Sequence, residues 1–102
     1  MSTVIVRYKV KADRVDENRA FIDKVFDTLK AEQPDGFRYA SFQGPDERSF
    51  THIASVDGDG AENPLPNMQA FKNFIADIKD RCDEPPQATN LTLVRTYRLV
   101  AD

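Results

Sequence analysis

The sequence has little of what metal, disulfide and zinc-binding proteins are built from. Its 102 residues include one cysteine, one histidine and no tryptophan. A lone cysteine, Cys82, excludes an internal disulfide and suits a reducing compartment such as the cytoplasm. One histidine and one cysteine are too few for the usual nitrogen and sulfur ligands of zinc. We therefore expect no bound metal.

The chain also lacks long apolar runs and an excess of positive charge. No stretch of 18 apolar residues occurs, so no membrane-spanning segment is expected. The 14 basic and 17 acidic residues give a net charge of −3, which argues against nucleic acid as a partner. The N-terminal MSTVIVRYKV begins a strand pattern at once, so no signal peptide is predicted. A cytoplasmic location follows as an expectation.

What remains is the composition of one globular domain, 40% hydrophobic and 30% charged, over residues 1–102. Alternating apolar residues predict four strands, at 3–10, 37–43, 49–56 and 89–100. Helical spacing predicts one helix that ends before Pro34. A second helix is expected at about 67–83, where Pro85 and Pro86 would stop it. The segment 57–66, rich in acids, glycine and proline, is expected to be a loop and the most mobile part of the chain.

The order of these elements is strand, helix, strand, strand, helix, strand. This order predicts an α+β fold of the ferredoxin-like βαββαβ type, with a four-stranded antiparallel sheet and both helices on one face. The opposite face carries Ile5 and part of the last strand, and it would stay uncovered in a monomer. We therefore expect a homodimer that buries this face in both copies.

On four segments the chain resembles the antibiotic biosynthesis monooxygenase-like proteins of the dimeric α+β-barrel superfamily. These segments are VIVRYKVKADRVDEN, PDGFRYASF, FTHIASVD and DRCDEPP, and together they extend over nearly the whole length. The resemblance implies a homodimer with pockets between sheet and helices. Some members of the group oxygenate polyketide-like aromatic molecules without a metal or organic cofactor, so no cofactor is expected here.

Other members of the group bind and degrade haem. They use an Asn on the first strand, a Trp at the end of the third strand and a His on the second helix. This chain has Val6 near the first position, Val56 at the second and no histidine on its second helix. The departures disfavour haem binding and haem degradation.

His52 is the first candidate site residue, because its side chain alone has an ordinary pKa near neutrality. It alternates with Phe50, Ala54 and Val56, which predicts a buried, neutral side chain on the helix-covered face, with Tyr8 on the adjacent strand. A catalytic role would be general base or hydrogen-bond donor to a bound oxygen. The alternative is a core histidine bonded to a tyrosine or a carbonyl.

Aromatic and basic side chains supply the substrate-binding candidates. Three tyrosines on different strands would line a pocket, or each would lie at the edge of the core. Phe71 and Phe74 form part of the core seam of the second helix and would also wall a cavity beside His52. Arginines on neighbouring strands would hold an anionic substrate, or pair with surface acids or pack in the dimer interface. The candidates are Tyr8, Tyr39, Phe71, Phe74, Arg95 and Tyr97, with Arg7 and Arg98 beside them.

Two functions stay open at this point. The first is a cofactor-independent monooxygenase that acts on a small aromatic or polyketide-like molecule. The second is a non-catalytic, dimeric protein that binds a small molecule or has a structural role. A cavity of about 300 Å³ or more that touches His52 would favour the first, and a filled core there would count strongly against an enzyme.

Overall fold

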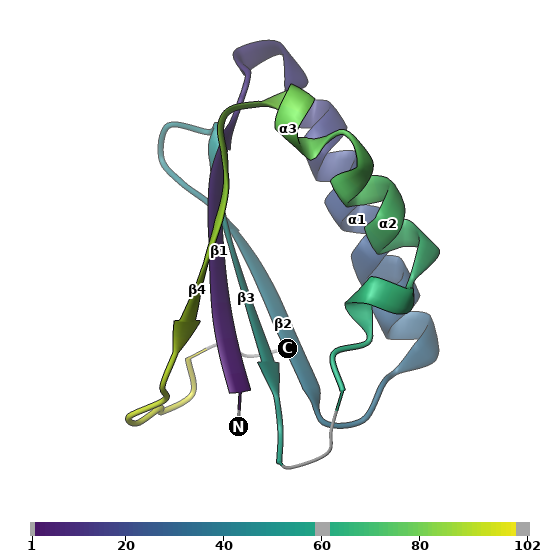
Figure 1. The fold of residues 1–102 in the computed structure, drawn as a ribbon, viewed down its shortest axis with the longest axis vertical. Coiled ribbons are helices and arrows are strands. Elements are labelled where there is room, and N and C mark those ends of the chain that lie inside the picture. The colour runs from purple at the N-terminus through teal and green to yellow at the C-terminus, as the bar shows by residue number, and fades with distance from the viewer. Residues whose placement is uncertain (1, 59–61, 100–102) are drawn as a thin grey trace.

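The computed structural model describes residues 2–58 and 62–99. Residues 59–61 of the predicted loop and residue 100 of the predicted last strand lie outside the described residues. Figure 1 shows a single sheet with the helices packed along one side of it. In chain order the elements are β1 (Ser2–Val10), η1 (Ala12–Arg14), α1 (Val15–Glu32), β2 (Phe37–Gln43), β3 (Ser49–Val56), η2 (Leu65–Asn67), α2 (Gln69–Ala76), α3 (Ile78–Arg81) and β4 (Cys82–Leu91).

The sheet has the order β2-β3-β1-β4, and every neighbouring pair is antiparallel. This arrangement is the predicted ferredoxin-like fold, which is therefore confirmed. The register places His52 of β3 between Ser41 of the edge strand β2 and Val6 of β1. The alternation along β1 and β3 is also as predicted, because Tyr8, Val10, Phe50 and His52 are all buried.

The helices cover the sheet with apolar stripes. Val25 of α1 and Phe74 of α2 are buried, and Leu65 and Met68 close the core from the segment that leads into α2. The helix α1 ends where Gln33 takes a left-handed conformation and its N–H bonds the carbonyl of Leu29. Among the described residues, no helix is long and apolar enough to cross a membrane.

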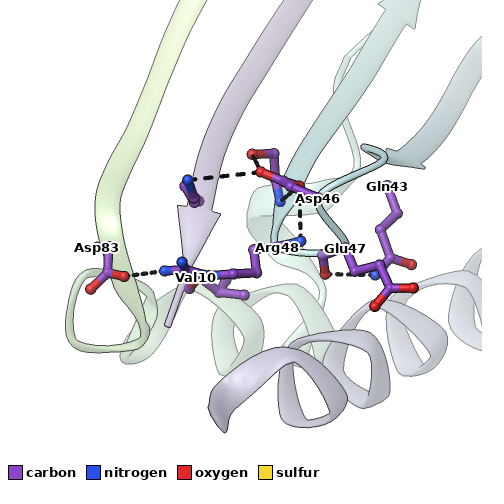
Figure 2. A network of polar contacts seen from close by, with 8 residues as sticks. Val10, Gln43, Asp46, Glu47, Arg48 and Asp83 are labelled. Carbon is purple, nitrogen blue, oxygen red and sulfur yellow. Dashed lines mark hydrogen bonds and ion pairs between the residues drawn. The ribbon is translucent and has the colours of Figure 1, made fainter. Parts of the chain in front are cut away.

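The turn between β2 and β3 is held by polar contacts that tie it to two other strands (Figure 2). The Asp46 carboxylate accepts hydrogen bonds from the backbone N–H of Arg48 and from the N–H and hydroxyl of Ser49. These donors lower the pKa of Asp46 to about 2. Arg48 donates to the Val10 carbonyl and pairs with Asp83, so it links the turn to β1 and β4.

The second helix differs from the prediction of one helix over 67–83. It is divided at Asp77, which leaves the helical region with φ −115° and ψ 16°, and its last part ends at Arg81. Two contacts fix this end: the Lys11 N–H bonds the Arg81 carbonyl, and Cys82 pairs with Val10 in the sheet. The chain therefore enters β4 as soon as it leaves the helix.

The predicted last strand, 89–100, is wrong in its position. The strand β4 begins at Cys82 and pairs antiparallel with β1, from Val10↔Cys82 to Thr3↔Leu91. This register uses β1 from Val10 to Thr3, so the residues after Leu91 continue beyond the paired part of β1. Pro85 and Pro86 lie inside β4, at a register shift opposite Tyr8, and an edge strand with a bulge tolerates them.

Candidate functional site

His52 lies deep between the sheet and the helices, with only 4% of its surface exposed. Its imidazole is stacked on the ring of Tyr8 at 5.3 Å between centroids and on that of Tyr39 at 5.8 Å. The ring of Phe74 lies 5.6 Å away from the helix side. Aromatic side chains from two neighbouring strands and one helix therefore fix its position.

Both ring nitrogens of His52 have hydroxyl partners. The Tyr8 hydroxyl lies 2.7 Å from Nε2. On the other side, the Ser41 hydroxyl lies 2.6 Å from Nδ1 and the Tyr39 hydroxyl lies 3.0 Å from it. The prediction that His52 is buried and hydrogen-bonded is confirmed, and its role in catalysis stays a prediction.

The polar contacts continue from Tyr8 into the interior. The Asn18 side-chain amide donates to the Tyr8 hydroxyl at 2.9 Å, and Arg81 Nε donates to Asn18 Oδ1 at 3.1 Å. Asn18 and Arg81 are both fully buried. We call the chain Arg81–Asn18–Tyr8–His52–Ser41 the buried relay.

The buried relay has one direction, which follows from Arg81. A guanidinium only donates hydrogen bonds, so the oxygen of the Asn18 amide must face it and the NH₂ must face Tyr8. The Tyr8 hydroxyl then accepts from Asn18 and has its own proton left for His52 Nε2. Since Nε2 accepts, the proton of the neutral imidazole is on Nδ1, facing Ser41 and Tyr39.

The opposite tautomer costs more. If Nε2 carried the proton, the Tyr8 hydroxyl would accept twice, and its own hydrogen would have no partner. Within residues 2–58 and 62–99, the Tyr8 hydroxyl is hydrogen-bonded to Asn18 and His52 alone. An unsatisfied buried donor costs about 1–3 kcal/mol. Tyr8 is buried whereas Tyr39 and Ser41 are only partly buried, so the Nδ1–H form, which satisfies Tyr8, is favoured.

Burial also decides the protonation states of the site. Removal from water disfavours the imidazolium and lowers the pKa of His52 to about 4, so the ring is neutral at pH 7. Burial raises the pKa of Tyr39 to about 12 against a smaller opposing effect of Ser41, and raises the pKa of Tyr8 further. Both phenols therefore keep their protons, and the Tyr8 proton is donated to His52 Nε2.

Arg81 is a buried cation whose hydrogen bonds are incomplete. Besides Asn18, it donates through Nη2 to the Phe74 carbonyl at 2.7 Å, while Nη1 has no partner among residues 2–58 and 62–99. Its guanidinium carbon lies 4.7 Å from the centroid of the Phe21 ring and 5.4 Å from that of Phe74. Burial lowers its pKa, yet an arginine stays charged in proteins, so the inner end of the relay is positive.

The other end of the relay reaches a shallow cleft of about 230 Å³ between α1 and the edge strand β2. We call it the Ser41 cleft. Its volume is below the range of about 300–1,000 Å³ for drug-sized ligands, so it suits a molecule of one or two rings. It is lined by Arg19, Ile22 and Asp23 of α1, by Ser41, Phe42 and Gln43 of β2, and by Phe50 of β3.

A second cavity of about 270 Å³ lies away from the relay, where the end of α1 meets the segment before α2, and includes Glu32 and Met68 in its lining. His52 lines neither cavity, and neither do Phe71 and Phe74. Neither of the two cavities is therefore the expected pocket bordered by His52 and these rings. In the described part of the chain, no group of three or more His, Cys, Asp or Glu side chains could hold a metal ion.

Comparison with known proteins gives the fold a name. Solved structures align with nearly the whole chain, among them Rv0793 from Mycobacterium tuberculosis, with a TM-score of 0.73 and 21% identity over 93% of this chain and 96% of that one. An antibiotic biosynthesis monooxygenase aligns with a TM-score of 0.75 and 15% identity over 93% of this chain and all of its own. The chain has the fold of the antibiotic biosynthesis monooxygenases.

A third solved structure is named for an oxygenase activity. A variant of SnoaB, a cofactor-independent oxygenase from Streptomyces nogalater, aligns with a TM-score of 0.68 and 15% identity over 93% of this chain and 94% of that one. At such identities the likeness shows the fold alone. No family model matches the sequence, and no curated protein does.

The monooxygenase-type fold brings four of the predicted site residues together. Tyr8 and Tyr39 bond the two nitrogens of His52, and Phe74 packs on its ring. Phe71 lies one layer further out, with its ring 6.0 Å from that of Phe74. The first three of these contacts come from β1, β2 and α2, as the alternation along the strands and the helical seam predicted.

Arg95 and Tyr97 are not brought to the site. The prediction placed them on the last strand, but they follow the end of β4 and are exposed, Tyr97 by 81%. Arg98 lies in the same segment, with its guanidinium over the Tyr97 ring at 5.3 Å. The expected cluster of arginines on neighbouring strands therefore does not form, and only Arg7 of that set lies on a strand.

Three polar residues of the site were missed. Asn18 lies three and seven positions before Phe21 and Val25, and Arg81 lies three and seven positions after Ile78 and Phe74, so each occupies the apolar stripe of its helix. A polar residue in such a stripe is the signal that would have found both. Ser41 gave no comparable signal, because its role depends on the pairing of β2 with β3.

Proposed function

We propose that the protein is a cofactor-independent oxygenase of a small aromatic or polyketide-like molecule. The observation that carries this proposal is the buried relay, which joins a neutral histidine to a hydroxyl in the Ser41 cleft. The fold supports it, since the neighbours include a protein named antibiotic biosynthesis monooxygenase and a variant of one named cofactor-independent oxygenase. The substrate class and the roles of the residues are part of the proposal.

Without a cofactor, the electrons for dioxygen must come from the substrate itself. An electron-rich phenol meets this need: 1-naphthol and O₂ give 1,4-naphthoquinone and water. One oxygen atom enters the ring, the other leaves as water, and the two electron pairs that reduce O₂ come from the naphthol. The protein would bind the phenol, orient it and guide its proton.

His52 suits hydrogen bonding better than free proton removal. With its pKa lowered to about 4, the imidazole lies about six pKa units below an ordinary phenol, a difference of about 8 kcal/mol for complete proton transfer. A neutral imidazole that polarises the Ser41 hydroxyl avoids this cost and still stabilises a developing negative oxygen. Of the two roles predicted for His52, donation to a bound oxygen is therefore the better supported, and it acts through Ser41.

A second candidate is a dimeric protein that binds a small molecule without changing it. One specific observation favours it: both His52 nitrogens are occupied by side chains of this chain, and the ring borders neither cavity. In this case the relay would serve to fix the core and the floor of the Ser41 cleft.

Oxygen uptake separates the two candidates. We expect the purified protein to consume O₂ with 1-naphthol and to place one atom of ¹⁸O₂ in the quinone. The variant Ser41→Ala should lower the rate about 100-fold, as the loss of one hydrogen-bond donor to a developing oxyanion does elsewhere. Ser55→Ala removes a hydroxyl from the opposite face of β3 and is the matched control. Binding of naphthol without oxygen uptake would support the second candidate instead.

The proposal includes a homodimer in the cytoplasm. The buried free thiol of Cys82 suits a reducing compartment. The face of the sheet without helices carries the apolar row Ile5, Ile53 and Ala40 across three paired strands, and a second copy would bury it.

A further inference from the structure

The inner end of the buried relay fixes what its outer end offers to a ligand. The Arg81 guanidinium has donor groups only and donates to Asn18, which in turn donates to Tyr8. The Tyr8 hydroxyl therefore donates to His52 Nε2, and the imidazole donates from Nδ1. Every hydrogen bond in the relay points the same way, from the buried cation toward the Ser41 cleft.

The last step of the relay occurs at Ser41. Its hydroxyl lies 2.6 Å from His52 Nδ1, against 3.0 Å for the Tyr39 hydroxyl, so the Nδ1 proton goes to Ser41 Oγ. The Ser41 hydroxyl is hydrogen-bonded to His52 and also acts on the neighbouring Tyr39 phenol, whose pKa it lowers. Ser41 lines the cleft. Once Oγ accepts the Nδ1 proton, the hydroxyl hydrogen of Ser41 is available to an acceptor oxygen, for which a ligand in the cleft competes with the Tyr39 oxygen.

The remaining lining gives the cleft little preference for charge. Arg19 and Asp23 carry opposite signs, while Ile22, Phe42 and Phe50 supply apolar walls. A ligand is then selected by its fit to these walls and by its hydrogen bond to the serine.

We infer that the Ser41 cleft selects an alicyclic or aromatic molecule with an acceptor oxygen, a ketone or a phenolate, over the matching hydrocarbon or amine. The inference names the substrate class of the site on which the proposed function rests. It assigns to Arg81 and Asn18 the part of positioning residues, which act on the ligand through Tyr8, His52 and Ser41. The Nδ1–H form of His52 is the state that carries the selection.

The first test reads the tautomer directly. The chain has one histidine, so ¹⁵N spectra of the imidazole contain one pair of ring signals. We expect a proton on Nδ1 at pH 7. Tyr8→Phe and Asn18→Leu should shift the population toward Nε2–H, and thermal melts of both variants show that they are folded. A wild-type ring protonated on Nε2, or a tautomer unchanged in both folded variants, would overturn the assignment.

The second test measures selection without turnover. The probes are 1-tetralone, tetralin and 1-aminotetralin, which share one bicyclic skeleton and differ in the group offered to Ser41. Under anaerobic conditions we expect 1-tetralone to bind about tenfold more tightly than the other two, as one additional hydrogen bond would give. Its binding should shift the His52 ring signals and the Ser41 amide signal in NMR spectra.

Two variants make this binding test specific. Ser41→Ala should abolish the preference for 1-tetralone, while Ser55→Ala should keep it. Equal binding of the three probes by the wild type, or a preference that is kept in Ser41→Ala, would refute the inference. Neither test measures oxygen uptake, so their failure is distinct from a failure to oxygenate naphthol.

Discussion

At the scale of single residues, the buried polar side chains decide the properties of the site. His52, Asn18 and Arg81 are each at most 4% exposed, in positions where an apolar side chain would be the ordinary choice. A buried polar group is tolerated when it is hydrogen-bonded, and each of the three bonds another member of the relay. Arg81 Nη1 is the exception, and the rings of Phe21 and Phe74 beside the guanidinium offset part of its cost.

Burial of His52 makes stability depend on pH in a defined direction. Its pKa is about 4 in the folded protein and 6.5 in an unfolded chain, so the unfolded chain binds more protons between these values. The stabilisation is complete above pH 6.5 and is lost as the pH falls through 4. Between pH 7 and 5 we expect the free energy of unfolding to fall by about 2 kcal/mol. Urea unfolding at several pH values measures this.

The control for this measurement is His52→Gln, which keeps hydrogen-bonding groups and does not titrate. Its unfolding free energy should be nearly constant from pH 7 to 5. The pKa of Glu17 and that of Asp46 are also lowered, but these carboxylates lose their contributions below pH 4.5. Parallel pH profiles for the wild type and His52→Gln would show that the imidazole is not held neutral by burial.

At the scale of elements, the predictions that depend on neighbouring residues were accurate, and those that depend on distant contacts were not. The first three strands were predicted to within a residue, because alternation over 3–10, 37–43 and 49–56 depends on neighbours in the sequence. The last strand was misplaced by several residues, because its register is set by the partner β1 and by the point where Arg81 ends the helix. The contacts of Asn18 with Tyr8 and Arg81 join residues 10 and 63 positions apart, which no local pattern encodes.

The connection between α1 and β2 depends on the left-handed conformation of Gly36, which a substitution can test. Gly36 has φ +69° at the start of β2, where its carbonyl accepts the Asp57 N–H. A side chain in this left-handed region costs about 1–2 kcal/mol, so Gly36→Ala should lower the free energy of unfolding by that amount. Gly44→Ala is the matched control: Gly44 is not among the positive-φ residues, and an added Cβ there would meet its nearest atoms at 3.5 Å. Equal losses in the two variants would contradict this interpretation of the turn.

At the scale of the whole molecule, the apolar surface is unevenly distributed. Five of the seven exposed large apolar side chains in the described part of the chain lie between Leu91 and Leu99. Val94 is 85% exposed and Leu99 is 75% exposed. Figure 1 shows this segment leaving the sheet beyond the end of β4, with the helices on the other side. Apolar side chains gathered in this way are typical of an interface rather than of a free surface.

A second copy of the chain would cover this segment together with the row Ile5, Ile53 and Ala40. We expect a stable dimer that buries at least about 1,200 Å² in total. Light scattering at micromolar concentration should therefore give twice 11.6 kDa. The double variant Val94→Asp with Leu99→Asp would bring buried, unpaired charges into both halves of a symmetric interface, so it should be monomeric.

The control for the dimer is Ile75→Asp, which changes an apolar side chain of α2 that is 45% exposed and lies on the helical layer. It should stay dimeric, since the proposed interface is formed by the other face of the sheet and by residues 91–99. A wild-type mass of 11.6 kDa would contradict the dimer altogether. Dissociation of Ile75→Asp, with the double variant still dimeric, would instead move the interface to the helices. That result would leave the row of Ile5, Ile53 and Ala40 exposed to water. A helix-side interface would then have to bury more apolar surface than this row offers in order to be the more stable one.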